Sequence, residues 1–184
     1  MSLEIIVGPM FSGKSSYAIS YIRRQQFIGK KILVVKPQID NRYSQDAVLV
    51  SHNKEQIPCM LWDINEPLNT SLPYFRESDC IVIEEAQFFK GLKNGITWLL
   101  RAHKKNIVLI GLDGDAYQKK FGEILDCIPW ANRVVKLEAL CCVCRDGTPA
   151  PFTKRIGEAN SETQICVGGQ DMYQAVCLNH LFGG

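Results

Sequence analysis

The segment that most constrains this chain is Gly8-Pro9-Met10-Phe11-Ser12-Gly13-Lys14-Ser15, which has the pattern GxxxxGKS. It directly follows the apolar run Leu3 to Val7, and a helical pattern follows it. This order of strand, glycine-rich loop and helix is that of a Walker A phosphate loop. Backbone N–H groups of such a loop and the positive end of the helix bind phosphates. The alternative is an ordinary glycine turn that contains GKS by chance.

The residues of this loop have different expected roles. Gly8 and Gly13 supply the bend that turns the N–H groups inward. The ammonium group of Lys14 is expected to contact the β- and γ-phosphates of ATP, and the Ser15 hydroxyl to bind the Mg²⁺ that bridges them. The expected ATP site is Gly8, Pro9, Met10, Phe11, Ser12, Gly13, Lys14 and Ser15.

The apolar runs predict a sheet of parallel strands. Buried strands are expected at residues 3–7, 31–35, 80–83, 106–111 and 133–137, with helices at 15–28 and between 89 and 100. Pro37 is expected to end the second strand, because proline cannot donate to the ladder. Alternating strands and helices are typical of an α/β fold, here a P-loop NTPase-like sheet flanked by helices.

Charge and hydropathy exclude several classes of partner. The 184 residues carry a net charge of +2, from 21 basic and 19 acidic side chains, with no block of five like charges. This argues against a nucleic-acid-binding arm. No apolar run approaches the ~18 residues of a membrane span, and no basic region followed by an apolar stretch opens the chain. The sequence therefore predicts a cytoplasmic protein with no membrane or nucleic-acid partner.

Two acidic residues follow the expected strand at 80–83. Glu84 and Glu85 stand at its carboxyl end, the edge where open α/β sheets bind ligands. One carboxylate in this Walker B position is expected to hold Mg²⁺, and the second to accept a proton from an attacking hydroxyl. The alternative is a pair of exposed glutamates without a role. The polar segment 36–53 has two open interpretations, a mobile segment near the phosphates and a solvated surface loop.

The cysteines cluster after residue 139. Cys141 and Cys144 form a CxxC pair, and Cys177 and His180 form a CxxH pair, a spacing typical of a closed structural zinc site. Cys142 could replace a neighbour as ligand, and buried or redox cysteines are the alternative. Cys59, Cys80, Cys127 and Cys166 are interpreted as core residues. We therefore expect two domains, a P-loop domain over 1–138 and a small zinc-binding domain over 139–184.

Together these motifs resemble the type II thymidine kinases, the cytosolic zinc-containing class. The resemblance covers essentially the whole chain. Besides the phosphate loop it rests on Glu85-Ala86-Gln87-Phe88-Phe89, Gly111-Leu112-Asp113-Gly114-Asp115, Phe152-Thr153-Lys154-Arg155, and Val167-Gly168-Gly169 leading through Tyr173 to Cys177. It implies transfer of the ATP γ-phosphoryl to the 5′-hydroxyl of thymidine, giving dTMP and ADP in nucleotide salvage for DNA synthesis, with deoxyuridine as a second expected substrate.

The resemblance also implies roles for single residues. Glu85 would be the general base, Glu84 with Ser15 would hold Mg²⁺, and Asp40 and Arg42 would lie near the phosphates. The thymidine would be surrounded by Met10, Phe88, Leu112, Tyr117, Phe152, Thr153, Val167, Gly168 and Tyr173. The loop between the zinc pairs would be a lasso over the base. A homotetramer, or a dimer, and feedback inhibition by dTTP are further family expectations.

The chain departs from the family pattern at several positions. Glu84 stands where the family has aspartate, Ala116 precedes Tyr117 where an aromatic residue is usual, and Lys120 replaces a common proline. Two rival functions remain open at this point. One is an inactive nucleotide-binding paralogue, which the intact Glu85 argues against. The other is an ATPase acting on nucleic acid, for which the basic patch is absent.

Overall fold

A computed structural model describes residues 1–38, 47–50, 56–156 and 172–183. At its centre is a sheet of six parallel strands in the order β5-β2-β6-β7-β1-β8. The strands are β1 (Ser2–Val7), β2 (Ile32–Gln38), β5 (Met60–Asp63), β6 (Cys80–Ile83), β7 (Asn106–Gly111) and β8 (Arg133–Lys136). The predicted parallel α/β sheet is confirmed, and its carboxyl edge carries both the phosphate loop and the Glu84-Glu85 pair.

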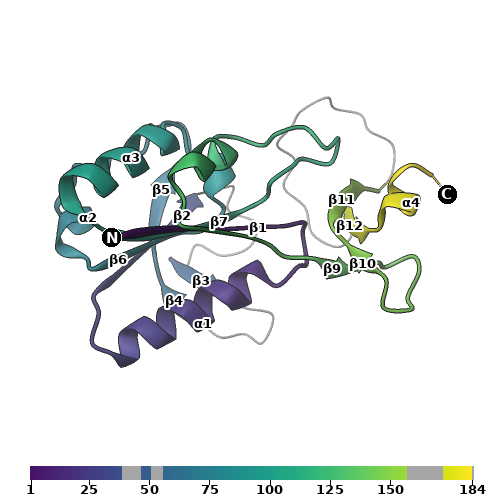
Figure 1. Ribbon diagram of the computed structural model, residues 1–184, viewed down its shortest axis with the longest axis horizontal. Coiled ribbons are helices and arrows are strands. Elements are labelled where there is room, and N and C mark those ends of the chain that lie inside the picture. Colours follow the sequence, from purple (N-terminus) through teal and green to yellow (C-terminus); the bar gives the residue numbers. More distant parts are fainter. Residues whose placement is uncertain (39–46, 51–55, 157–171, 184) are drawn as a thin grey trace.

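Helices cover both faces of this sheet (Figure 1). One face is covered by α1 (Lys14–Phe27), and the other by α2 (Pro73–Glu77) and α3 (Leu92–His103). The short helices η1 (Ala86–Phe88) and η2 (Ile124–Trp130) follow β6 and β7, and α4 (Leu178–Leu181) ends the described chain. Gly29, at φ 76°, follows α1 as the expected C-terminal glycine.

Alternation along β1 divides the core into two layers. Leu3, Ile5 and Val7 pack with the α2 and α3 side, whereas Ile6 packs with the α1 side, as the two-residue period of a strand requires. A small hairpin, β3 (Val48–Val50) and β4 (Gln56–Pro58), adds Leu49 and Ile57 to the α1 layer. No helix in the described part of the chain is long and apolar enough to cross a membrane.

Pro37 does not end its strand, contrary to the prediction. It lies inside β2, buried and in register with Trp62 of β5. The Val35 carbonyl accepts a hydrogen bond from Glu84 N, so the main-chain N and O atoms of Val35 point toward β6. Pro37, two residues later, directs its main-chain atoms to the same side. Because β6 pairs with β2 only as far as Ile83, the nitrogen of Pro37 points to a side where no strand is paired with it. The missing N–H group therefore breaks no ladder hydrogen bond.

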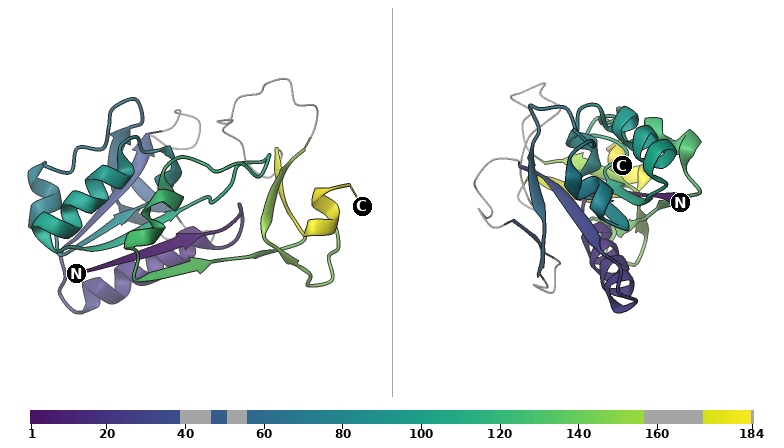
Figure 2. Two further views of the ribbon diagram at one scale, coloured as in Figure 1. Left: turned by 45° about the horizontal axis from the view of Figure 1, so that its top comes forward. Right: turned by 90° about the vertical axis from the view of Figure 1, so that its left-hand side faces the viewer.

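A small unit of short strands follows β8 at the end of the molecule away from the N-terminus (Figure 2). It consists of two antiparallel ribbons, β9 (Ala139–Leu140) with β10 (Pro149–Ala150) and β11 (Phe152–Arg155) with β12 (Tyr173–Val176). These ribbons pack around a small core of alanine, valine and cysteine side chains, and Phe11 of the phosphate loop packs against it. The unit thus lies directly beside the carboxyl edge of the sheet.

Candidate active site

The phosphate loop has a backbone that demands glycine. Gly8 and Gly13 have φ values of 154° and 83°, in the region that side chains rarely adopt. A Cβ at Gly8 would lie 2.5 Å from the Leu137 carbonyl oxygen, so the loop passes tightly beside the end of β8. Gly13 then begins α1 at its N-cap position. The loop and the helix N-terminus are arranged as a phosphate cradle.

Lys14 is buried inside this loop. Its Nζ donates to the Pro9 carbonyl at 2.6 Å, and the Ser12 hydroxyl donates to the same oxygen at 2.8 Å. Burial lowers the pKa of Lys14, and the charges of Glu85, Glu84 and Asp113 oppose that shift. The ammonium group is therefore held by a carbonyl of the loop itself and lies in the field of three carboxylates.

Glu84 connects the Walker B strand to the phosphate loop. The Ser15 hydroxyl donates to Glu84 Oε1 at 2.6 Å, and the Glu84 side chain is only 4% exposed. Desolvation, helped by the negative charge of Glu85, raises the pKa of Glu84 to about 7. A hydroxyl and a buried carboxylate at this position are oxygen ligands of the kind that Mg²⁺ prefers.

Glu85, the residue after Glu84, has an unusual backbone. It has φ 53° and ψ 43°, a left-handed conformation that places the chain in the short helix η1. Its carboxylate is half-buried and accepts a hydrogen bond from Gln87 Nε2. Gln87 Oε1 in turn accepts from the Leu112 N–H at 3.0 Å, so this group joins the ends of β6 and β7.

The expected nucleoside site lies between the loop and the small C-terminal unit. Thr153 on β11 is buried, and its Oγ1 accepts from Met10 N at 2.9 Å. Its carbonyl accepts from Gln118 Nε2 at 3.1 Å. The Asp115 carboxylate orders the intervening turn by accepting from the Tyr117 and Lys119 N–H groups, both at 2.9 Å. Three separate segments therefore meet at Thr153.

The aromatic residues expected around thymidine differ in exposure. Phe88 is half-buried and packs edge-on against Phe121 at 5.2 Å between ring centroids. Phe152 is half-buried and Tyr173 is buried, whereas Tyr117 is 47% exposed. Ala116, the alternative to Tyr117, is half-buried.

Lys136 forms a contact in this region that the sequence did not indicate. Its Nζ lies 2.7 Å from Asp113 Oδ2 and 5.7 Å from the centroid of the Phe152 ring. The negative charge of Asp113 also acts to raise the pKa of Lys14. Lys136 thus joins the carboxyl edge of the sheet to β11.

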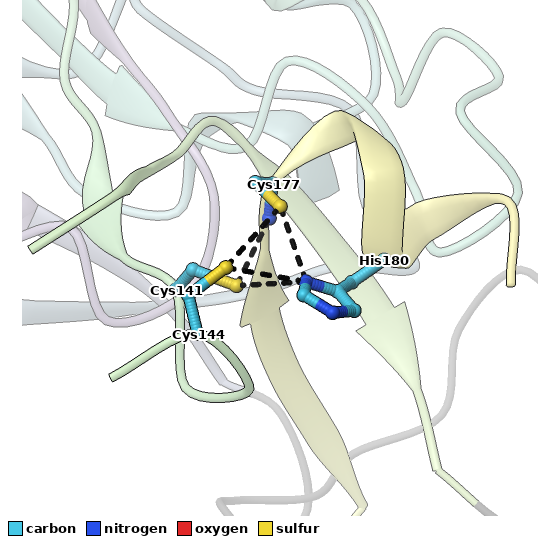
Figure 3. Close-up of side chains that lie close together, drawn as sticks. All are labelled: Cys141, Cys144, Cys177 and His180. Carbon is cyan, nitrogen blue, oxygen red and sulfur yellow. Dashed lines mark hydrogen bonds between the residues drawn. The ribbon is translucent and has the colours of Figure 1, made fainter. Parts of the chain in front are cut away.

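The two cysteine pairs converge as predicted (Figure 3). The ligand atoms of Cys141, Cys144, Cys177 and His180 all lie within 4.8 Å of one another. The Cys144 and Cys177 sulfurs are 3.8 Å apart, and the three sulfurs lie 3.2 to 3.6 Å from His180 Nδ1. A tetrahedral zinc ion with ordinary bond lengths has edges of about 3.8 Å and 3.5 Å for such pairs. The donor set therefore fits zinc.

The local backbone also favours a metal-binding thiolate. Desolvation raises the pKa of Cys141, but N–H groups of Cys144, Cys177 and Val143 outweigh it and lower that pKa to about 6. Thiolate is the form that binds a metal. Cys142 is not a member of the cluster; its N–H donates to Ala175 O at 3.1 Å. Cys80 and Cys127 are buried and Cys59 is half-buried, as core residues are.

Four expected site residues lie outside the described part of the chain, namely Asp40, Arg42, Val167 and Gly168, as does Cys166. Sequence reasoning missed three contacts of the site, made by Gln87, Gln118 and Lys136. Gln87 stands inside the Glu85 motif, which could have drawn attention to it. No local pattern marks Gln118 or Lys136, because their partners come from distant segments.

Fold and site together define a class. A phosphate loop after β1, a paired Ser15 and Glu84, and a second acid at Glu85 are the parts of a P-loop phosphotransferase.

The thymidine kinase family model matches residues 1–181. Thymidine kinase a of Arabidopsis thaliana is 36% identical over 183 residues, covering 97% of this chain and 74% of that protein. A thymidine kinase of Oryza sativa subsp. japonica is 36% identical over 187 residues, covering 99% of this chain and 66% of that protein.

The chain therefore belongs to the thymidine kinase family, the enzymes that phosphorylate thymidine to dTMP. The match to the family model includes the small unit after β8, with its Cys₃His cluster. It assigns no role to single residues of this chain.

Proposed function

We propose that this chain transfers the γ-phosphoryl of ATP to the 5′-hydroxyl of thymidine, with Glu85 as general base. The observation that carries the proposal is the pair at the end of β6. Glu84 is buried and accepts a hydrogen bond from Ser15, whereas Glu85 is half-buried and accepts one from Gln87. One carboxylate is thus committed to the phosphate side and the other is available to the nucleoside.

Positioning and charge neutralisation supply most of the catalysis. The N–H groups of the phosphate loop and the Lys14 ammonium bind the phosphates, and Lys14 stabilises charge on the transferred group. Glu85 takes the proton from the 5′-hydroxyl as the oxygen attacks the γ-phosphorus. Ser15 and Glu84 would hold Mg²⁺, which when bound neutralises phosphate charge. Asp40 and Arg42 are proposed to lie near the phosphates.

The nucleoside is proposed to bind between the phosphate loop and the zinc-binding unit. Met10, Phe88, Leu112, Tyr117, Phe152, Thr153 and Tyr173 would line this site, with main-chain groups of Val167 and Gly168 on the base. Cys141, Cys144, Cys177 and His180 would bind one structural zinc, because four protein ligands leave no position for a catalytic water. The lasso, from this zinc unit, would cover the base.

The remaining proposals rest on the sequence patterns and on family membership. They are a division into domains at 1–138 and 139–184, a homotetramer or dimer, inhibition by dTTP, and a cytoplasmic location. Sedimentation with and without dTTP, together with rate measurements at increasing dTTP, tests the second and third of these. A monomer insensitive to dTTP would contradict both.

A nucleoside panel tests the proposed activity. Purified protein with Mg-ATP should phosphorylate thymidine and deoxyuridine and refuse deoxyadenosine and deoxyguanosine, since a lasso of main-chain groups has little room for a purine. Glu85→Gln keeps the size of the side chain but cannot accept the proton, so kcat should fall by about 10² to 10⁴-fold while ATP affinity hardly changes. Binding of thymidine and ATP without turnover in the parent protein would instead favour the inactive nucleotide-binding module.

A further inference from the structure

We infer that Gln87 is a positioning residue, which holds the Glu85 carboxylate in the orientation that takes the proton of the 5′-hydroxyl. The inference rests on the proposed role of Glu85 as the base. Gln87 is only 3% exposed, although it is polar and stands at the edge of the site. A buried amide needs partners for both its ends, and these partners decide its orientation.

The orientation of this amide is fixed by its backbone partner. Leu112 N–H can only donate, so the group that faces it must be the amide oxygen, Oε1. The amide nitrogen then faces Glu85 Oε2 and donates to it. A flipped amide would turn two donors toward each other at Leu112. The Leu112 N–H group, at the end of β7, therefore determines that Gln87 donates its other hydrogen bond to Glu85.

The walls around Gln87 hold it in place. A Cβ at Gly111 would lie 2.3 Å from Gln87 Oε1, and a Cβ at Gly122 would lie 2.0 Å from the Gln87 main-chain oxygen. Any side chain at either position would therefore displace Gln87. Glycine at these two positions allows β7 and the Gly122 turn to approach Gln87 closely.

This arrangement divides the work of the two Glu85 oxygens. Oε2 is held by the amide, and Oε1 is then the oxygen that takes the hydroxyl proton. A glutamate without such a partner samples several rotamers, and ordering it costs conformational entropy. Misplacement of a reacting group by 1 Å costs about 10²-fold in rate. Loss of the hydrogen bond should thus appear in kcat and leave the binding of both substrates intact.

The first test removes both hydrogen bonds at constant length. Gln87→Met should lower kcat by about 10- to 100-fold, with KM values for thymidine and ATP within about threefold of the parent. Gln25→Met is the matched control, because Gln25 is half-buried and contacts Cys80 at the opposite end of β6. Its kcat should stay within about twofold. An unchanged kcat in Gln87→Met would overturn the inference.

A double-mutant cycle separates positioning from simple loss of structure. In a Glu85→Gln background, Gln87→Met should lower kcat by less than about twofold, because Gln87 acts only through the Glu85 carboxylate. Radiolabelled thymidine and high enzyme concentrations make these low rates measurable. A similar loss of kcat in both backgrounds would mean that Gln87 has only a structural role, and would overturn the inference. Near-full activity of Glu85→Gln by itself would instead overturn the base assignment.

Gln87→Glu keeps the inference testable if Gln87→Met does not fold. This variant retains the size of the side chain and an acceptor for Leu112 N–H, but it donates to Glu85 only when its new carboxyl group is protonated. Its kcat relative to the parent should therefore be highest near pH 6 and fall steadily toward pH 9, with the folded fraction verified by circular dichroism at each pH. A ratio independent of pH would contradict the inference.

Discussion

At the scale of single residues, the site depends on two adjacent glutamates in different surroundings. Glu84 is buried against the Ser15 hydroxyl, and Glu85 is half-buried and held by Gln87. The left-handed backbone of Glu85, at φ 53°, costs on the order of 1 kcal/mol. The two adjacent carboxylates thus have different hydrogen-bond partners, which fits the different roles proposed for them.

The metal role proposed for Glu84 leads to a prediction at the scale of single residues. Glu84→Gln keeps an oxygen that can accept from Ser15 but loses the charge that attracts Mg²⁺. The Mg²⁺ concentration for half-maximal rate should therefore rise by about tenfold or more. Glu84→Asp, the residue usual in the family, should stay active. Titration of Mg²⁺ for each variant measures this. If Glu84→Gln abolished turnover at saturating Mg²⁺ while Glu85→Gln did not, the two roles would be reversed.

The burial of Glu84 also predicts how stability depends on pH. Desolvation raises its pKa from 4.5 to about 7. Between these two values the folded state keeps a proton that the unfolded chain releases, so the free energy of unfolding falls as pH rises. Glu84→Gln has no buried carboxyl group that must ionise at this position, so its stability does not fall in this way. Its stability relative to the parent should increase between pH 5.5 and 8 by on the order of 1–3 kcal/mol.

Urea unfolding in Mg²⁺-free buffer measures that difference. Chelators must be omitted, because they would remove zinc as well. A difference in unfolding free energy that stays constant with pH, or that shrinks as pH rises, would show that the Glu84 carboxylate is not destabilised by burial.

At the scale of elements, η1 and the turn at Gly122 must pack backbone to backbone. Gly122 has φ 60°, and an added Cβ would lie 2.0 Å from the Gln87 carbonyl oxygen. Gly122→Ala should therefore destabilise the fold by more than about 3 kcal/mol, since strain and a backbone clash add. Gly29→Ala is the control, because Gly29 also has a positive φ but no atom within 4 Å of the added Cβ.

Thermal unfolding of the two variants compares these costs. Gly29→Ala should cost only about 1 kcal/mol, the penalty for a left-handed alanine. Equal losses at the two positions would mean that the Gly122 turn and η1 can separate without cost. The packing of η1 between β7 and this turn would then not be what fixes Gln87.

At the scale of the whole molecule, the unit that carries the Cys₃His cluster and the sheet are joined at the proposed nucleoside site. Met10 donates to Thr153, Lys136 contacts both Asp113 and the Phe152 ring, and Phe11 packs against the small core of the unit. A change in the metal cluster should therefore reach the substrate. The strands β11 and β12 connect the metal cluster to the proposed substrate site.

Loss of one zinc ligand tests this coupling. Cys144→Ser should lower thermal stability and raise the thymidine KM, because a closed structural site contributes folding energy directly. The KM for ATP should change less, since the phosphate loop belongs to the sheet. Elemental analysis of the parent should give about one zinc per chain when zinc is supplied. Absence of zinc, or an unchanged thymidine KM in Cys144→Ser, would contradict the coupling.

Local patterns in the sequence determined the parts of this protein that are contiguous. The phosphate loop occupies eight successive residues, the buried strands are apolar runs, and each zinc pair spans four residues. Chelate spacing within each pair, joined with the count of four ligands, sufficed to predict that Cys141 and His180 meet. The parallel sheet followed from alternation of strands and helices.

Contacts between distant segments depend on how the whole chain packs. The order β5-β2-β6-β7-β1-β8 sets Leu112 beside Gln87 and brings Lys136 to Asp113, and no local pattern encodes that order. The same order explains Pro37, which continues its strand because β6 ends before reaching it. Periodicity reports which face of an element is buried, but neighbours across a sheet are chosen by the packing of the whole chain.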